Sequence, residues 1–176
     1  MFEYLMPLLL TKAYENSLLE YACRAAVLRQ MEYGRKLGIP WGISEAAFSA
    51  IDQSKTYQYR AFGVPGLGLK RGLEDDLVVA PYATVMALMV EPQESLENLR
   101  RLEESGMRGS HGFYESIDYT RARVPEGERG VPVRTFMVHH QGMSLLALCN
   151  VLNNNAMQKR FHADRRVVAA APLLYE

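Results

Sequence analysis

The 176-residue sequence has no excess of charge of either sign. Lys and Arg together number 20, as do Asp and Glu, so the formal net charge is zero. Nucleic acids and anionic membrane surfaces are bound through a basic face. The charge balance therefore argues against either as the main partner, and it leaves little electrostatic protection against self-association.

Cysteine and long hydrophobic runs are also scarce. The two cysteines, Cys23 and Cys149, each lie in an apolar, helix-like stretch. That context predicts buried free thiols rather than a disulfide or a metal pair. No apolar run reaches the roughly 18 residues of a membrane span. The opening stretch, residues 1–10, is short and carries Glu3 without a preceding basic region, so it makes a poor signal peptide.

The rest of the composition is that of a globular domain. Hydrophobic residues make up 48% of the chain and charged residues 23%, as in folded rather than disordered chains. A length of 176 residues is sufficient for one domain with a core.

Local signals predict a mostly helical chain. Ser17 and Glu20 form a capping box at a helix that ends before Gly38. Periodicity, prolines at first turns and terminal glycines predict further helices, over residues 44–51, 81–90, 92–106, 136–152, 156–161 and after 164. Only residues 112–120 alternate like a strand. The expected fold class is therefore all-α with one short β element at Gly112–Thr120.

Two motifs with possible ligand chemistry give weak signals. The glycine-rich stretch 62–72 does not match a phosphate loop, because Lys70 is followed by Arg71 instead of Ser or Thr. Adjacent residues on a helix point about 100° apart, so His139 and His140 are an awkward metal pair, and we predict no metal site. One histidine is expected to be buried and satisfied, and the other, with Gln141, to face a polar pocket.

The carboxylates are more informative. Five of them lie among aromatic residues or glycines rather than on charged helix faces: Glu3, Glu45, Asp75, Glu115 and Asp118. Glycoside-cleaving enzymes use two carboxyl groups that flank the scissile bond. Sugar faces could stack on nearby aromatic rings, for which the candidates are Trp41, Tyr57, Tyr59, Tyr114 and Tyr119. The alternative is that these rings are ordinary core and loop packing.

Glu45 is the carboxylate that can be argued furthest. If Ser44 is a helix N-cap, Glu45 lies in the first turn, where the helix dipole stabilises a negative charge by roughly 0.3–1 kcal/mol. An ionised carboxylate suits a nucleophile or a general base better than a proton donor. Burial beside Trp41 would instead favour the neutral, protonated form of the carboxyl group.

Six segments, in this order, cover nearly the whole chain and resemble a known family. They are MFEYLMPLL, GIPWGISEAAFSAID, YQYRAFGVPGLGLKRGLEDDLVVAPYAT, HGFYESIDYT, MVHHQGMSLLAL and MQKRFHAD. Together they resemble the central glycoamylase-like domain of bacterial cyclic β-1,2-glucan synthases. Several long segments at matching spacing are far more specific than one short motif.

The resemblance implies part of an (α/α)6 toroid, with residues 1–176 as a partial domain of a much larger multidomain protein. It implies retaining transglycosylation that cyclises linear β-1,2-glucan, with no cofactor. The partners would be the glucan and the remaining domains of a parent enzyme at the cytoplasmic side of the bacterial inner membrane. This chain itself would be soluble, and exposed helix faces would allow homo-oligomers. The alternatives are endo-β-1,2-glucanase-like hydrolysis and a non-catalytic glucan-binding or packing fragment.

The resemblance also assigns residues. Glu45 falls on a catalytic glutamate, which we interpret as the nucleophile. The acid/base partner would belong to a segment upstream of residue 1, and Glu115 is the alternative partner within this chain. The residues that match cleft-lining segments are Glu3, Trp41, Tyr57, Tyr59, Asp75, Tyr114, His139, His140 and Gln141.

Overall fold

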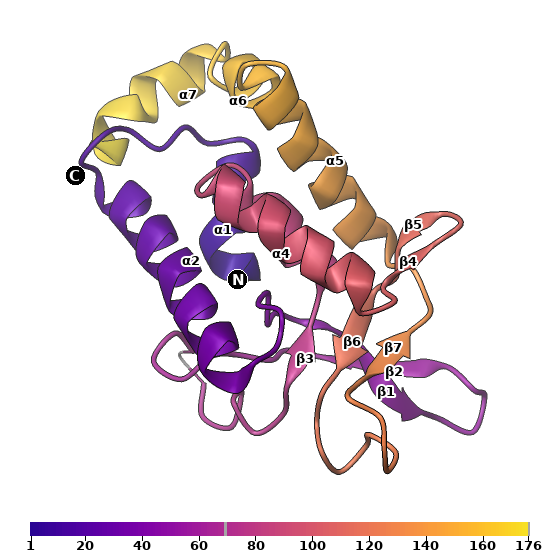
Figure 1. The fold of residues 1–176 in the computed structure, drawn as a ribbon. Helices are drawn as coiled ribbons and strands as arrows, with labels where there is room; N and C mark the ends of the chain where they lie inside the picture. Colours follow the sequence, from indigo (N-terminus) through magenta and orange to yellow (C-terminus); the bar gives the residue numbers. More distant parts are fainter. Residues whose placement is uncertain (69, 176) are drawn as a thin grey trace.

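Helices form most of the regular structure in the computed structural model, which describes residues 1–68 and 70–175. In chain order they are α1 (Phe2–Leu5), η1 (Met6–Leu9), α2 (Leu18–Leu37), α3 (Pro81–Ala87), α4 (Pro92–Glu104), α5 (Val138–Leu152), α6 (Ala156–Phe161), α7 (Arg165–Ala170) and η2 (Ala171–Leu174). The strands gather at one end of the molecule, beyond α4 and the start of α5 (Figure 1).

The strands show that the expectation of an all-α fold was wrong. Within the described residues they form three small antiparallel sheets, ordered β1-β2, β3-β6-β7 and β4-β5. The strands are β1 (Ala46–Ile51), β2 (Tyr57–Arg60), β3 (Val78–Val79), β4 (Arg108–Gly109), β5 (Gly112–Phe113), β6 (Ser116–Asp118) and β7 (Val131–Val133). All of these strands lie in the segments between helices, where helix-oriented sequence signals give no indication of strand pairing. The β element expected at Gly112–Thr120 corresponds to β5 and β6.

Most of the predicted helices are confirmed, because their signals are local. The Ser17 side chain accepts a hydrogen bond from the Glu20 amide, and Gly38 ends α2 with φ of 67°. The α6 range is as predicted, whereas α3 ends at Ala87, three residues before the predicted end at 90. Both cysteines are free thiols, as predicted, but Cys149 is only half-buried, whereas burial of both was expected. Cys23 is buried, and burial raises its pKa to about 11.

Residues 44–51 were predicted to be helical and are not. Residues 46–51 form β1, in which Ala47 pairs with Tyr59 of β2. The turn between the strands is fixed by Asp52, whose Oδ1 accepts hydrogen bonds from the amides of Ser54 and Thr56. Pairing with β2 thus outweighs the helix preference of the Glu-Ala-Ala sequence, since strand formation depends on context.

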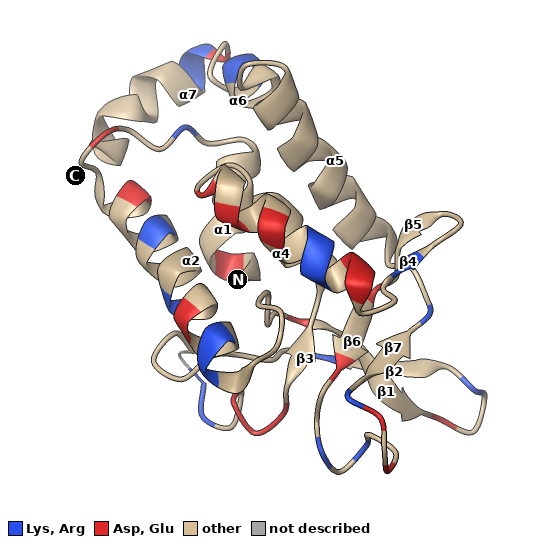
Figure 2. Cartoon of the chain, in the orientation of Figure 1, with Lys and Arg blue, Asp and Glu red and all other residues tan. Residues whose placement is uncertain are grey.

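The hydrophobic core surrounds α3, all of whose residues are buried. α3 packs against α4 and α5. α2 and α4 carry charged residues of both signs, whereas α5 carries none (Figure 2). In residues 1–68 and 70–175, no helix is both long enough and apolar enough to cross a membrane.

Gln30 of α2 fixes the segment that leads to Glu45. Its buried side-chain amide donates to the carbonyl of Ile43 at 2.7 Å and accepts from the amides of Ile43 at 2.9 Å and Gly42 at 3.3 Å. These backbone groups belong to no helix, so the Gln30 side chain supplies the hydrogen-bond partners that a helix would otherwise supply.

We expect Gln30→Met to lower the free energy of unfolding by about 3 kcal/mol, because buried backbone groups of residues 42 and 43 would lose their partner. Urea denaturation measures the change. Gln53→Met, in the exposed turn after β1, is the matched control and should change stability by less than about 0.5 kcal/mol. Equal losses in the two variants would contradict the role given to Gln30.

Candidate active site

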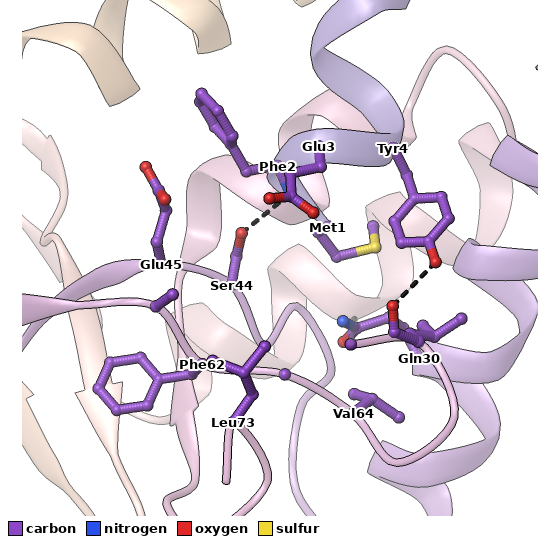
Figure 3. Close-up of a pocket in the computed structure, with 14 residues that line it drawn as sticks. Met1, Phe2, Glu3, Tyr4, Gln30, Ser44, Glu45, Phe62, Val64 and Leu73 are labelled. Atoms are coloured by element: carbon purple, nitrogen blue, oxygen red, sulfur yellow. Dashed lines mark hydrogen bonds between the residues drawn. The ribbon is translucent and has the colours of Figure 1, made fainter. Parts of the chain in front are cut away.

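Glu45 lies immediately before β1, half-buried, at the point where the chain enters the β1–β2 hairpin. The Tyr59 hydroxyl of β2 donates a hydrogen bond of 2.8 Å to its Oε1. Ser44 is not a helix N-cap: its Oγ accepts from the amide of Phe2 at 3.0 Å (Figure 3). The helix-dipole argument for Glu45 therefore fails, and a phenol hydroxyl takes the place of the helix terminus as its stabilising donor.

Two histidines reach the same hydroxyl. The Nε2 atoms of His139 and His140 each lie 3.2 Å from the Tyr59 oxygen, and the two ring centroids are 4.1 Å apart. The argument from helix geometry that neighbouring histidines diverge was wrong here. Both residues are in the first turn of α5, and their side chains converge on one atom despite the angle between their Cβ directions.

Glu115 anchors His140 from the opposite side. Its Oε1 lies 2.8 Å from Nδ1 of His140 and accepts the amide of Ala47 at 3.2 Å. His140 is fully buried, Glu115 is 2% exposed, and Tyr82 stacks on the imidazole at 3.7 Å between centroids. Contacts of 2.8, 3.2 and 2.8 Å thus link the two carboxylates through Tyr59 and His140. We call Glu45, Tyr59, His139, His140 and Glu115 the Glu45 network.

The network shifts the titration of its members. Burial raises the pKa of Tyr59, and its hydrogen bond to Glu45 raises it further, so the phenol stays protonated at neutral pH. The pKa of His139 is lowered, first by desolvation and then by its neighbour His140. At neutral pH the network therefore holds a donor phenol and a neutral His139 beside Glu45.

Other predicted residues surround this network at different depths. Glu3 is exposed and, with Glu45, lines a narrow cavity of about 60 Å³ (Figure 3). That volume is far below the roughly 300 Å³ of small-molecule sites. A larger cavity of about 170 Å³ lies on the far side of His140 and is lined partly by Tyr114, Glu115 and Gln141.

Trp41 does not lie where its proposed role requires, whereas Asp75 is accessible. Trp41 is 4% exposed, and its backbone is held by Asn98, so its ring is core packing rather than a sugar platform. Asp75 is exposed, whereas its neighbour Asp76 is buried and paired with Arg60 and Arg123. Tyr57 is half-buried in β2.

Sequence reasoning missed Tyr82. Its hydroxyl donates to the carbonyl of Glu45 at 3.0 Å and lies 2.8 Å from Oγ of Ser44, while its ring supports His140. The surrounding apolar run was correctly predicted as a buried helix. A tyrosine hydroxyl buried in such a run needs a polar partner, and that was the available signal.

The glycoamylase family model, described as "Putative glucoamylase", matches residues 1–165. The chain belongs to the glycoamylase family. This confirms the resemblance carried by the six sequence segments.

Among these relatives, the cyclic β-(1,2)-glucan synthase NdvB of Rhizobium meliloti is 48% identical over all 176 residues, which span 6% of that protein. A Bacteroides fragilis structure with the same description as the family superposes with a TM-score of 0.68 at 17% identity, over 99% of this chain and 40% of the other. The structure of the endo-β-1,2-glucanase of Chitinophaga pinensis, in complex with sophorotriose and glucose, superposes with a TM-score of 0.58 at 16% identity. The match covers 89% of this chain and 35% of the other. These two likenesses concern the fold.

Proposed function

We propose that the chain forms part of a carbohydrate-active enzyme that acts on β-1,2-glucan, and that Glu45 is its nucleophile. The observation that carries the proposal is Glu45 itself: a carboxylate at the mouth of a hairpin, oriented by the Tyr59 hydroxyl. The 48% identity to a cyclic β-(1,2)-glucan synthase supports the substrate class.

The proposed reaction is retaining transglycosylation. The Glu45 carboxylate attacks C1 of a glucosyl unit, the bond from C1 to the leaving oxygen breaks, and that oxygen takes a proton from an acid group. A 2-hydroxyl at the other end of the same glucan chain then attacks C1, gives up its proton and releases Glu45. The product is a ring. Two inversions at C1 preserve the β configuration.

Glu115 was the alternative acid/base partner within this chain. Its burial and the use of its Oε1 by His140 and Ala47 favour a positioning role instead. Of the residues implied to bind substrate, we propose the more accessible ones for glucan contact, which are Glu3, Tyr57, Tyr59, Asp75, Tyr114, His139 and Gln141.

Hydrolysis is the second candidate, favoured by the fold shared with an endo-β-1,2-glucanase. The two reactions differ only in whether water or a sugar hydroxyl attacks the intermediate. We expect incubation of the chain with linear β-1,2-glucan to give products one water lighter than linear chains of equal length, as read by mass spectrometry. Shorter reducing chains would indicate hydrolysis instead. Binding without products would support a non-catalytic module, and neither binding nor products would overturn the proposal.

A further inference from the structure

The Glu45 network contains three metal-ligating side chains in one place. A carboxylate oxygen of Glu45 and one ring nitrogen each of His139 and His140 lie within 4.8 Å of one another. The Tyr59 oxygen lies among them, 2.8 Å from Glu45 Oε1 and 3.2 Å from each Nε2. Four electron-rich atoms from three separate segments thus surround one small volume.

The hydrogens available do not satisfy these atoms. The Tyr59 hydroxyl has one hydrogen, and it donates that hydrogen to Glu45. The Oε1 of Glu115 already accepts an amide hydrogen from Ala47, so it acts as an acceptor for the Nδ1–H of His140. A neutral imidazole carries one N–H. In the neutral tautomer that donates Nδ1–H to Glu115, the Nε2 of His140 presents a lone pair toward the oxygen of Tyr59. A cation at this point would replace that unfavourable contact with bonds.

The surroundings of His140 are those of a preformed metal ligand. Metal-binding histidines usually donate their second ring nitrogen to a carboxylate, which fixes the tautomer and makes the free nitrogen more basic. Glu115 does this for His140 at 2.8 Å, and the stacked ring of Tyr82 fixes the orientation of the imidazole. Because His140 is fully buried, the ligand direction is set before any ion arrives.

The local charge also favours a divalent ion. Neither Lys nor Arg forms an ion pair with Glu45 or Glu115 in the part of the chain that the structure describes. The nearby Arg60 and Arg123 pair with Asp76.

We propose that Glu45, His139 and His140 bind a divalent transition-metal ion of the Zn²⁺ or Cu²⁺ class. Two imidazoles and one carboxylate suit these ions, whereas Mg²⁺ and Ca²⁺ prefer oxygen ligands. Bond lengths of about 2.0–2.2 Å require the ligands to move inward. The exposed His139 and half-buried Glu45 are free to do this around the fixed His140, while the Tyr59 hydroxyl becomes a fourth ligand or moves aside.

Metal binding at this site has a consequence that rests on the proposed function. An ion bound to Glu45 removes the carboxylate from attack on C1, so Zn²⁺ would inhibit the reaction on β-1,2-glucan. The binding itself does not depend on that function, since it follows from the ligand geometry alone.

Cu²⁺ titration with calorimetry and electron paramagnetic resonance tests the binding. We expect one ion per chain, with coupling to two nitrogens. His139→Ala should weaken binding at least 10-fold and leave one coupled nitrogen, and Glu45→Gln should also weaken it. The matched control is His111→Ala, an exposed histidine outside the network, and should bind as the wild type does. Cys149→Ser, also expected to be unchanged, excludes thiol binding.

Equal binding by the wild type and His139→Ala, or no stoichiometric binding by the wild type, would overturn the proposal. His139 is exposed, so its variant is expected to fold, and circular dichroism checks this. If the chain binds the metal but does not act on glucan, the proposed function fails and the metal site stands. If it acts on glucan but does not bind metal, the reverse holds.

Discussion

Glu45→Gln is expected to lower the rate of product formation from linear β-1,2-glucan by at least about 10³-fold. The amide has the shape of the carboxylate and can still accept the Tyr59 hydroxyl, which donates at 2.8 Å. It cannot form the ester to C1. The loss should therefore appear in the rate and not in the stability of the fold. Product formation followed by chromatography, together with urea denaturation, measures both.

Glu94→Gln is the matched control for this variant. Glu94 is exposed in the first turn of α4, on a charged helix face. The same change of charge at that position should leave the rate within about twofold of the wild type. A Glu45→Gln variant that forms products at a comparable rate would remove Glu45 from the reaction.

Asp118→Asn is expected to lower the free energy of unfolding at neutral pH by about 3 kcal/mol. The carboxylate is buried in β6 and accepts five hydrogen bonds, from Ser49 N–H and O–H, Thr120 N–H and two Arg123 nitrogens. It joins β1 to β6, and an asparagine would leave Arg123 without its charge partner. The side-chain NH₂ group of the asparagine would also face N–H and O–H groups that need an acceptor. Urea denaturation measures the loss, and Asp75→Asn, at an exposed carboxylate, is the control.

The comparison of the wild type with Asp118→Asn also predicts how the stability contributed by this carboxylate depends on pH. Burial alone would raise the pKa of Asp118, but the hydrogen bonds from Arg123, Thr120 and Ser49 outweigh it and lower the pKa below 3.8. Because the folded state binds this proton less readily than the unfolded chain, the contribution is fully present above about pH 4 and is lost as the pH falls through the lowered value. The difference between wild type and Asp118→Asn should therefore be constant from pH 7 to about 5 and shrink below 4. A constant difference down to pH 3 would contradict the assignment.

The helices were predictable because each is defined by its own residues and by the capping residues at its two ends. Ser17, Glu20 and Gly38 bound α2 through contacts within a few residues. β1 was not predictable in this way, because its pairing depends on residues 57–60 and on the turn that Asp52 nucleates. The all-α expectation failed for the same reason, because the strands lie in the segments between helices and show little periodicity in sequence.

Glu45 itself was predicted from sequence, but its environment was not. The stabilising donor was expected to be a helix terminus, whereas it is Tyr59, a residue singled out only as a sugar-binding ring. The pairing of Glu115 with His140 joins segments 25 residues apart in sequence and depends on the docking of α5 beside β6. No local pattern encodes such a contact, and helix geometry argued against the convergence of the two histidines.

The β1–β2 hairpin has a consequence for how the site forms. Glu45 and Tyr59 are 14 residues apart, whereas Tyr59 and His139 are 80 apart. Contacts between near neighbours in sequence close faster than distant ones, because less chain entropy is lost. We therefore expect the carboxylate and its phenol to meet early in folding, and the imidazoles to join them when α5 docks. The network would then be complete only after the most distant of its segments has been brought together.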